Sequence, residues 1–140
     1  MYQPDSHRNW SRLSLGALQA FIGIGGVAGG IGLISDPTGD NMGMSIEMLT
    51  ASPFSDFLIP GLTLLAVNGL GSLLGAFLTV SKRPFAAEVA LGLGAFLVAW
   101  IMVQVYFIGL VHFLQPLYLG FGILEFTLGL LLRRTLPSPK

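Results

Sequence analysis

The sequence contains no cysteine, only two histidines and few charged residues for a chain of 140 residues. The absence of cysteine excludes thiol–disulfide chemistry, iron–sulfur ligation and zinc sites built from thiolates. Charged residues make up 10% of the chain and hydrophobic residues 53%. A water-soluble protein needs more polar surface than this to cover such a core. The net charge is zero, and no basic patch of the kind that binds nucleic acid is present.

Four long apolar stretches occupy residues 13–35, 58–80, 86–108 and 114–132. An apolar helix of about 20 residues crosses the hydrocarbon core of a bilayer. The sequence therefore predicts an all-α, polytopic integral membrane protein, a four-helix bundle that forms a single membrane domain over residues 1–140. The polar residues that precede the first stretch are expected to be poorly ordered.

Lysine and arginine are missing from one side of this predicted bundle. All seven flank the apolar stretches on the same side: Arg8, Arg12, Lys82, Arg83, Arg133, Arg134 and Lys140. Flanks that carry Lys and Arg stay cytoplasmic, so the N- and C-termini are predicted to lie inside. Residues 36–57 then form an external loop. The basic clusters are placed to bind anionic headgroups of membrane lipids. We expect a multi-pass protein of the cell (inner) membrane, in which any homo-oligomer is parallel.

The external loop contains two local patterns. Residues 44–50 are predicted to form one or two turns of helix on the outer surface, with Ser45 as the N-cap. The oxygen-rich run at Asp36, Asp40 and Asn41 lacks the alternating spacing of a calcium loop, so it is interpreted as a turn with Asx capping. The Phe54 and Phe57 side chains insert either into the bilayer or over the bundle.

Nineteen glycines in so apolar a chain indicate close helix packing, because helices in lipid associate through small residues. Spacings of three and four place these residues on one face of each helix. The glycines predicted to pack are Gly23, Gly26, Gly30, Gly71, Gly75, Gly122 and Gly129. In residues 86–108 the predicted interior face carries Glu88, Gly92, Ala95, Ala99 and Tyr106. The short connections near residues 82–84 and 109–113 predict that sequential helices are neighbours.

Polar residues on these faces are the candidate binding residues: Gln19, Asn68, Tyr118 and Glu125, with Gln104 on a different face nearer the outside. Glu125 lies near mid-membrane, where an ionised carboxylate costs at least about 2.5 kcal/mol. Burial without a cation at that depth favours the neutral acid. As a neutral acid, Glu125 is expected to donate to Asn68 and to accept from Tyr118 or from another amide. It acts either as a cross-brace between helices or as a protonatable site in a polar cavity.

Metal and cofactor sites are not indicated. His7 and His112 fall on opposite sides of the predicted membrane, so they cannot jointly ligate a haem or a metal ion. Glu88 and Glu125 differ too much in depth to act as paired carboxylates in an enzyme. Glu88 is interpreted as a favourable acid in the first turn of its helix.

The four-span layout, with Asn68-Gly69-Leu70-Gly71 in a leucine-rich second span that ends near Lys82 and Arg83, loosely resembles small bacterial DoxX-like membrane proteins. Their second helix often has an acidic residue before a glycine pair. Here Asn68 occupies the acidic position, and the glycines are separated. The resemblance implies a bacterial inner-membrane protein and little about mechanism.

The sequence favours two functions, and a membrane enzyme that acts on a lipid or a quinone ranks third because histidines are few and no carboxylates are paired at one depth. The first is a small membrane protein without evident catalysis, an accessory, assembly or lipid-interacting bundle with a partner membrane protein or a second copy. The alternative is a transporter or small-molecule binding protein whose intramembrane site contains Glu125 and Asn68.

Overall fold

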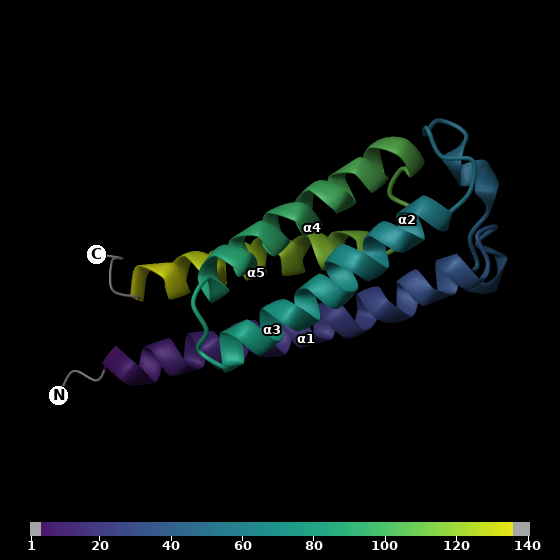
Figure 1. Cartoon of the computed structure of the whole chain (residues 1–140). Coiled ribbons are helices and arrows are strands. Elements are labelled where there is room, and N and C mark those ends of the chain that lie inside the picture. The colour runs from purple at the N-terminus through teal and green to yellow at the C-terminus, as the bar shows by residue number, and fades with distance from the viewer. Residues whose placement is uncertain (1–3, 136–140) are drawn as a thin grey trace.

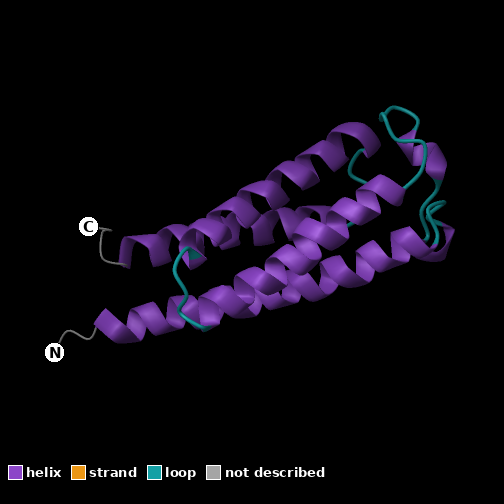
Figure 2. Ribbon diagram, in the orientation of Figure 1, coloured by secondary structure: helices purple, strands orange, loops and turns teal. Residues whose placement is uncertain are grey.

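The computed structural model describes residues 4–135, with side chains from Asn9 onward, and this part of the chain is helical apart from its connecting loops (Figure 1, Figure 2). The elements are α1 (Pro4–Ser35), the short 3-10 helices η1 (Asp40–Met42) and η2 (Ile46–Leu49), α2 (Leu58–Thr63), the π-helix η3 (Leu64–Gly71), α3 (Ser72–Val80), α4 (Ala86–Ile108) and α5 (Leu114–Thr135). Because α2, η3 and α3 follow one another without a break, they form one helix, which we call the second span.

Four helices are long and apolar enough to cross a membrane: Asn9–Ser35, Leu58–Val80, Ala86–Ile108 and Leu114–Thr135. The middle two cover the same residues as the predicted stretches. The first helix differs, because α1 already begins at Pro4, within residues expected to be poorly ordered. A helix satisfies its own backbone hydrogen bonds, so it can continue past the apolar segment into a polar one.

The basic residues of the described chain gather at one end of the bundle. The start of α1, the loop between α3 and α4 and the end of α5 lie together there, opposite the loop that holds η1 and η2 (Figure 1). We call the first the basic end and the second the loop end. Arg8 belongs to α1 by its backbone, whereas Lys140 lies outside the described residues.

The helices pack as two pairs, α1 with the second span and α4 with α5. Sequential helices are neighbours, as predicted, but the second span and α4 pack less extensively than a tight hairpin would require. The loop joins the two helices, but α4 packs chiefly along α5, where Gly94 brings the backbones together. A Cβ atom at Gly94 would lie 2.7 Å from the backbone nitrogen of Phe126. The close approach of two backbones at a glycine therefore determines which helix α4 packs against more strongly than the length of the connecting loop does.

The small-residue face predicted for α4 is wrong. Glu88, Gly92, Ala95, Ala99 and Tyr106 are all exposed, and Tyr106 is 82% exposed. The buried face of α4 instead consists of Ala86, Ala87, Ala90, Gly94, Leu97 and Ile101. Both faces contain small residues at spacings of three and four, so periodicity alone could not choose between them. Glu88 does lie in the first turn of the helix, as its interpretation required.

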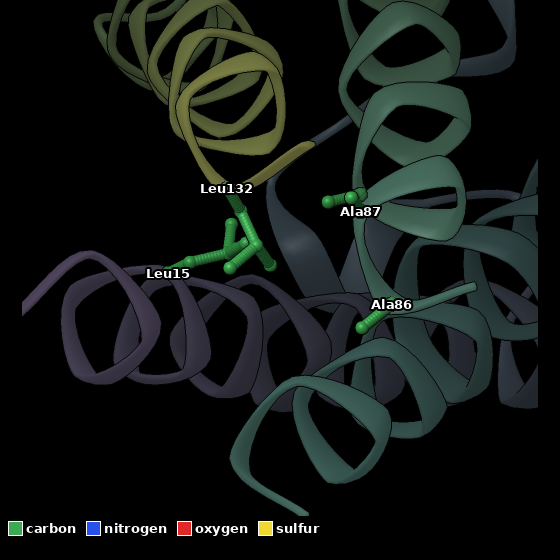
Figure 3. Close-up of a cluster of buried hydrophobic side chains, with 5 residues drawn as sticks. Leu15, Ala86, Ala87 and Leu132 are labelled. Carbon is green, nitrogen blue, oxygen red and sulfur yellow. The ribbon is translucent and has the colours of Figure 1, made fainter. Parts of the chain in front are cut away.

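Three apolar clusters hold the bundle together along its length. At the basic end, Leu15 of α1 points toward Leu132 of α5 beside Ala86 and Ala87 of α4 (Figure 3). Ile22, Leu97 and Ile101 form the middle cluster. At the loop end, Leu33, Leu49 and Phe57 pack together. Each cluster joins helices from both pairs or ties the loop to a helix end.

The loop of residues 36–57 folds over the end of the bundle and is ordered by its own side chains. Phe57 is 3% exposed and belongs to the loop-end cluster. Of the two positions predicted for this side chain, it therefore takes the one over the bundle and not the one in the bilayer. The backbone N–H of Glu47 donates to the Ser45 hydroxyl at 3.3 Å, so Ser45 caps η2 as predicted. Asp36 accepts from the Thr38 hydroxyl at 2.6 Å and from the backbone N–H of Asn41 at 3.1 Å. The predicted Asx turn is therefore confirmed.

Candidate functional site

A polar cluster lies inside the bundle where α1, α3 and α5 meet. The Gln19 amide of α1 donates to Oε1 of Glu125 at 3.4 Å. The hydroxyl of Thr79 in α3 donates to Oε1 of Gln19 at 2.9 Å. All three side chains are fully buried, with an exposed fraction of 0%. One glutamine therefore connects three helices through both ends of its amide group.

The neighbouring glycines make room for this cluster. A Cβ atom at Gly75 would lie 2.9 Å from Nε2 of Gln19. Gly75 and Thr79 are four residues apart and so share one face of the second span. Thr79 was missed from the sequence, although it continues the polar and small stripe of Asn68, Ser72 and Gly75. The spacing of four residues between Gly75 and Thr79 indicates that Thr79 lies on the same buried face of the helix.

Of the partners expected for Glu125, neither Asn68 nor Tyr118 is observed, and the donor is the other amide that was left open, that of Gln19. Tyr118 is half-buried two turns earlier in α5, and its hydroxyl lies against α1, because a Cβ atom at Gly25 would come within 2.5 Å of it. Asn68 is 2% exposed and lies in η3, beside Gly26 of α1. The rotation of each helix about its axis decides which of these polar side chains meet. Gln19 and Glu125 are thus brought together, whereas Asn68, Tyr118 and Gln104 lie elsewhere.

Three buried polar side-chain atoms of the described residues have no hydrogen-bond partner: Oε2 of Glu125, Nδ2 of Asn68 and Nε1 of Trp100. Buried polar groups in proteins are nearly always hydrogen-bonded. Asn68 also belongs to the π-helix Leu64–Gly71, and single π-turns inside α-helices are frequent at functional sites. Packing alone therefore does not explain these three atoms.

The glycines predicted to pack all lie against a neighbouring helix. Gly23, Gly26 and Gly30 contact the second span, Gly71 and Gly75 contact Leu93 of α4, and Gly122 and Gly129 contact α4. The closest approach is at Gly26, where a Cβ atom would lie 2.5 Å from the backbone nitrogen of Gly69. Gly69 was not among the predicted residues, although it adjoins Asn68 on the same turn.

Among the cavities formed by the described residues, two have linings that do not include Glu125. The first lies at the loop end between α1, the second span, α4 and the loop of residues 36–57, and Gln104 is part of its wall. The second is a groove on the outside of α4 and α5, lined by Ala95, Ala99 and Phe126 among others. No ionisable side chain lines either of these two cavities.

Metal ligation finds no support among the described residues. No group of three or more His, Asp or Glu side chains in that part of the chain is arranged to hold a metal ion. His112 instead caps the start of α5, since its Nδ1 accepts from the backbone N–H of Leu114 at 3.1 Å. The side chain of His7 lies outside the described residues.

The fold defines a class, that of proteins with four helices able to span a membrane and a polar cluster buried between them. Comparison with protein-family models, curated proteins and solved structures gives no match for the chain.

Proposed function

We propose that this chain is an integral membrane protein without catalysis of its own, an accessory or lipid-interacting bundle whose buried polar cluster is a structural brace. The observation that carries the proposal is the position of Glu125. This carboxyl group is 0% exposed and accepts from Gln19, and it lines neither cavity. A general acid or base must come within hydrogen-bond reach of a substrate. A carboxyl group enclosed in this way instead joins α5 to α1.

The proposed orientation follows from the charges at the basic end. Lys82 and Arg83 lie in the loop after α3, and Arg133 and Arg134 lie in the last turn of α5. Short flanks rich in Lys and Arg are retained in the cytoplasm, so the basic end is the cytoplasmic one in this proposal. The protein is then a multi-pass component of a bacterial inner membrane, with the DoxX-like proteins as a loose structural parallel.

The proposed lateral partner is a second, parallel copy of the chain, bound at the groove between α4 and α5. The groove has a volume of about 350 Å³, and Ala95 and Ala99 on its wall are exposed. Small residues let a second helix approach closely in lipid. The charge asymmetry requires the copies to be parallel, which brings the two Ala99 residues to the same depth. Oxidative cross-linking of Ala99→Cys tests this contact, with Phe77→Cys on α3 as the control.

A transporter with a site at Glu125 and Asn68 is the second candidate. Its support comes from two of the three partnerless atoms, Oε2 of Glu125 and Nδ2 of Asn68. A water-filled or substrate-filled space reaching both atoms would satisfy them. Such a space requires an opening of the bundle, because both residues are buried.

Reaction with a membrane-soluble carbodiimide separates the two candidates. This reagent modifies carboxyl groups that it can reach within the bilayer, and mass spectrometry identifies the modified residue. A structural brace predicts that Glu125 stays unmodified in the folded protein while exposed Glu88 serves as the reactive reference. Modification of Glu125 at a rate comparable to that of Glu88 would contradict the brace and favour the transporter.

A further inference from the structure

The turn between α4 and α5, residues 109–113, differs in chemistry from the other loop at the same end of the bundle. The loop of residues 36–57 carries four carboxyl groups, those of Asp36, Asp40, Glu47 and Asp56. By contrast, the turn falls within residues 89–124, a stretch with no Asp, Glu, Lys or Arg. Charged side chains are costly to place in a bilayer. Of the two loops, therefore, only this turn can enter a bilayer without burying a carboxylate.

The side chains of this turn are apolar and exposed. Leu110 is 69% exposed, Val111 54% and Phe113 70%. The exposed surface continues onto both neighbouring helices, through Tyr106 of α4 and Leu114 of α5. Exposed apolar patches commonly mark an interaction surface. The turn therefore presents such a surface, continuous with the exposed sides of two helices.

Gln115 satisfies the backbone of the turn from inside the fold. Its side chain is 5% exposed, and its Oε1 accepts from the backbone N–H groups of Val111 at 2.8 Å and of His112 at 3.2 Å. Its Nε2 donates to the carbonyl oxygen of Gly109 at 3.1 Å. One buried amide group thus makes three hydrogen bonds that water would provide to an ordinary surface turn.

These internal bonds matter because the hydrocarbon core offers the backbone no partners, and irregular backbone does not occur exposed to it. The N–H of Leu114 is satisfied in the same local way, by Nδ1 of His112 at 3.1 Å. Among the described N–H groups of this turn, those of Leu110 and Phe113 have no protein acceptor. Ester carbonyl groups of lipids can accept from them at the boundary between headgroups and acyl chains. The hydrogen bonding of the turn therefore fits this boundary better than the hydrocarbon core.

The position of the turn in the bundle agrees with that depth. In Figure 1, the loop of residues 36–57 and the end of α1 extend past the end of α4, where the turn begins. The 23 residues of α4, Ala86–Ile108, span about 35 Å at the usual rise per residue. The hydrocarbon core is about 30 Å thick. With the basic end at one edge of this core, the turn falls at the opposite edge.

We propose that residues 109–113 are an interfacial anchor, which inserts into the lipid leaflet at the loop end. The backbone of the turn lies at the level of the lipid ester groups, and Leu110, Val111 and Phe113 reach the acyl chains. Gln115 is the positioning residue, because its three hydrogen bonds let the turn leave water. The partner of this surface is thus the bilayer and not a second protein. The anchor rests on the membrane placement proposed above.

Nitroxide labels on single cysteines measure this depth, since the chain contains no cysteine of its own. The full chain is labelled at Leu110→Cys and placed in phosphatidylcholine nanodiscs. Collision of the label with oxygen, which concentrates in lipid, is compared with its collision with a water-soluble nickel complex. Ser55→Cys, exposed in the loop of residues 36–57, is the reference for water. Leu70→Cys, exposed in the middle of the second span, is the reference for lipid.

We expect the ratio of oxygen to nickel collision at Leu110→Cys to exceed that at Ser55→Cys several-fold and to approach that at Leu70→Cys. A ratio equal to that at Ser55→Cys would overturn the anchor and leave the membrane placement intact. Low collision with both reagents would show that protein covers the turn, which would overturn the assignment to lipid. If Leu70→Cys itself gave the ratio for water, the membrane placement would fail and the anchor with it.

A second pair of variants tests the role of Gln115. Gln115→Leu keeps a side chain of similar size but leaves three backbone groups of the turn without their partner. The turn should then move into water, and the collision ratio at Leu110→Cys should fall several-fold. Gln104→Leu removes the same kind of amide group from α4 and, as the matched control, should leave the ratio unchanged. An unchanged ratio in Gln115→Leu would overturn the positioning role of Gln115.

Discussion

Gln19 donates to Glu125 across 3.4 Å between residues that are 106 positions apart in the sequence. The same glutamine accepts from Thr79 through its carbonyl oxygen at 2.9 Å. The first and last helices are thus connected at a point where the second span also contributes. In a membrane interior, side-chain hydrogen bonds of this kind hold helices together alongside small-residue packing.

Replacing Glu125 tests the brace. Glu125→Leu leaves Nε2 of Gln19 buried without an acceptor, which should lower the free energy of unfolding by about 1–3 kcal/mol. Glu125→Gln retains an acceptor oxygen of the same shape and should lose less. Thermal unfolding in detergent, followed by circular dichroism, measures both variants.

The double variant Gln19→Leu with Glu125→Leu is the control for that experiment. The double variant removes the Gln19 amide together with its acceptor, so no amide is left buried without a partner. The Thr79 hydroxyl, which loses Gln19 as its acceptor, can donate to a backbone carbonyl of its own helix. The double variant should be more stable than Glu125→Leu alone, with a coupling energy of about 0.5–3 kcal/mol. Simple additivity of the two single substitutions would argue against a direct bond.

The contact of Gly26 with Gly69 should be intolerant of any side chain. A Cβ atom at Gly26 would lie 2.5 Å from the backbone nitrogen of Gly69, and two packed helices cannot move apart locally without cost. Gly26→Ala is therefore expected to destabilise the protein by about 1–3 kcal/mol. At Gly92 nothing lies within 4 Å of an added Cβ atom, so Gly92→Ala should leave the melting temperature unchanged or raise it. Equal melting temperatures for the two variants would contradict the observed packing.

Asp36 should titrate below the usual range of an aspartate. The Thr38 hydroxyl and then the backbone N–H of Asn41 donate to its carboxylate and lower its pKa below 3.8. Because the pKa of Asp36 is lower in the folded state, its carboxylate stabilises the turn fully at any pH above the pKa of the unfolded chain. This stabilisation is lost as the pH falls through the lower pKa of the folded protein. Carbon NMR of the labelled side chain measures the titration. Thr38→Val should raise the pKa, and an unchanged value would show that the hydroxyl is not the main cause.

The orientation of the bundle can be measured without background, because the chain contains no cysteine. Ser55→Cys at the loop end and Ser81→Cys at the basic end both replace exposed residues. A maleimide that cannot cross membranes should label Ser55→Cys in intact cells and Ser81→Cys only after the membrane is broken, because short flanks with Lys and Arg generally stay cytoplasmic. The reverse labelling pattern would invert the proposed topology.

The helices and the crowding of basic residues at one end follow from local sequence. Whether a segment can span a bilayer depends on its own hydrophobicity and on the Lys and Arg residues that flank it. The bounds of residues 58–80 and 86–108 could therefore be predicted without knowing which helices pack beside them. The turn at Asp36 and the cap at Ser45 were likewise predictable, because their partners lie within a few positions. These contacts involve short stretches of chain and need no tertiary information.

The rotation of each helix about its axis was decided only in the assembled bundle. On α4, Gly92 and Gly94 belong to two faces that are both rich in small residues, and the one that meets the backbone of α5 at Phe126 became the interior. The partner of Glu125 was decided in the same way, since Asn68 and Gln19 were both polar residues on small faces. Packing energy depends on the simultaneous fit of several helices, and that fit is a property of distances between residues far apart in the chain.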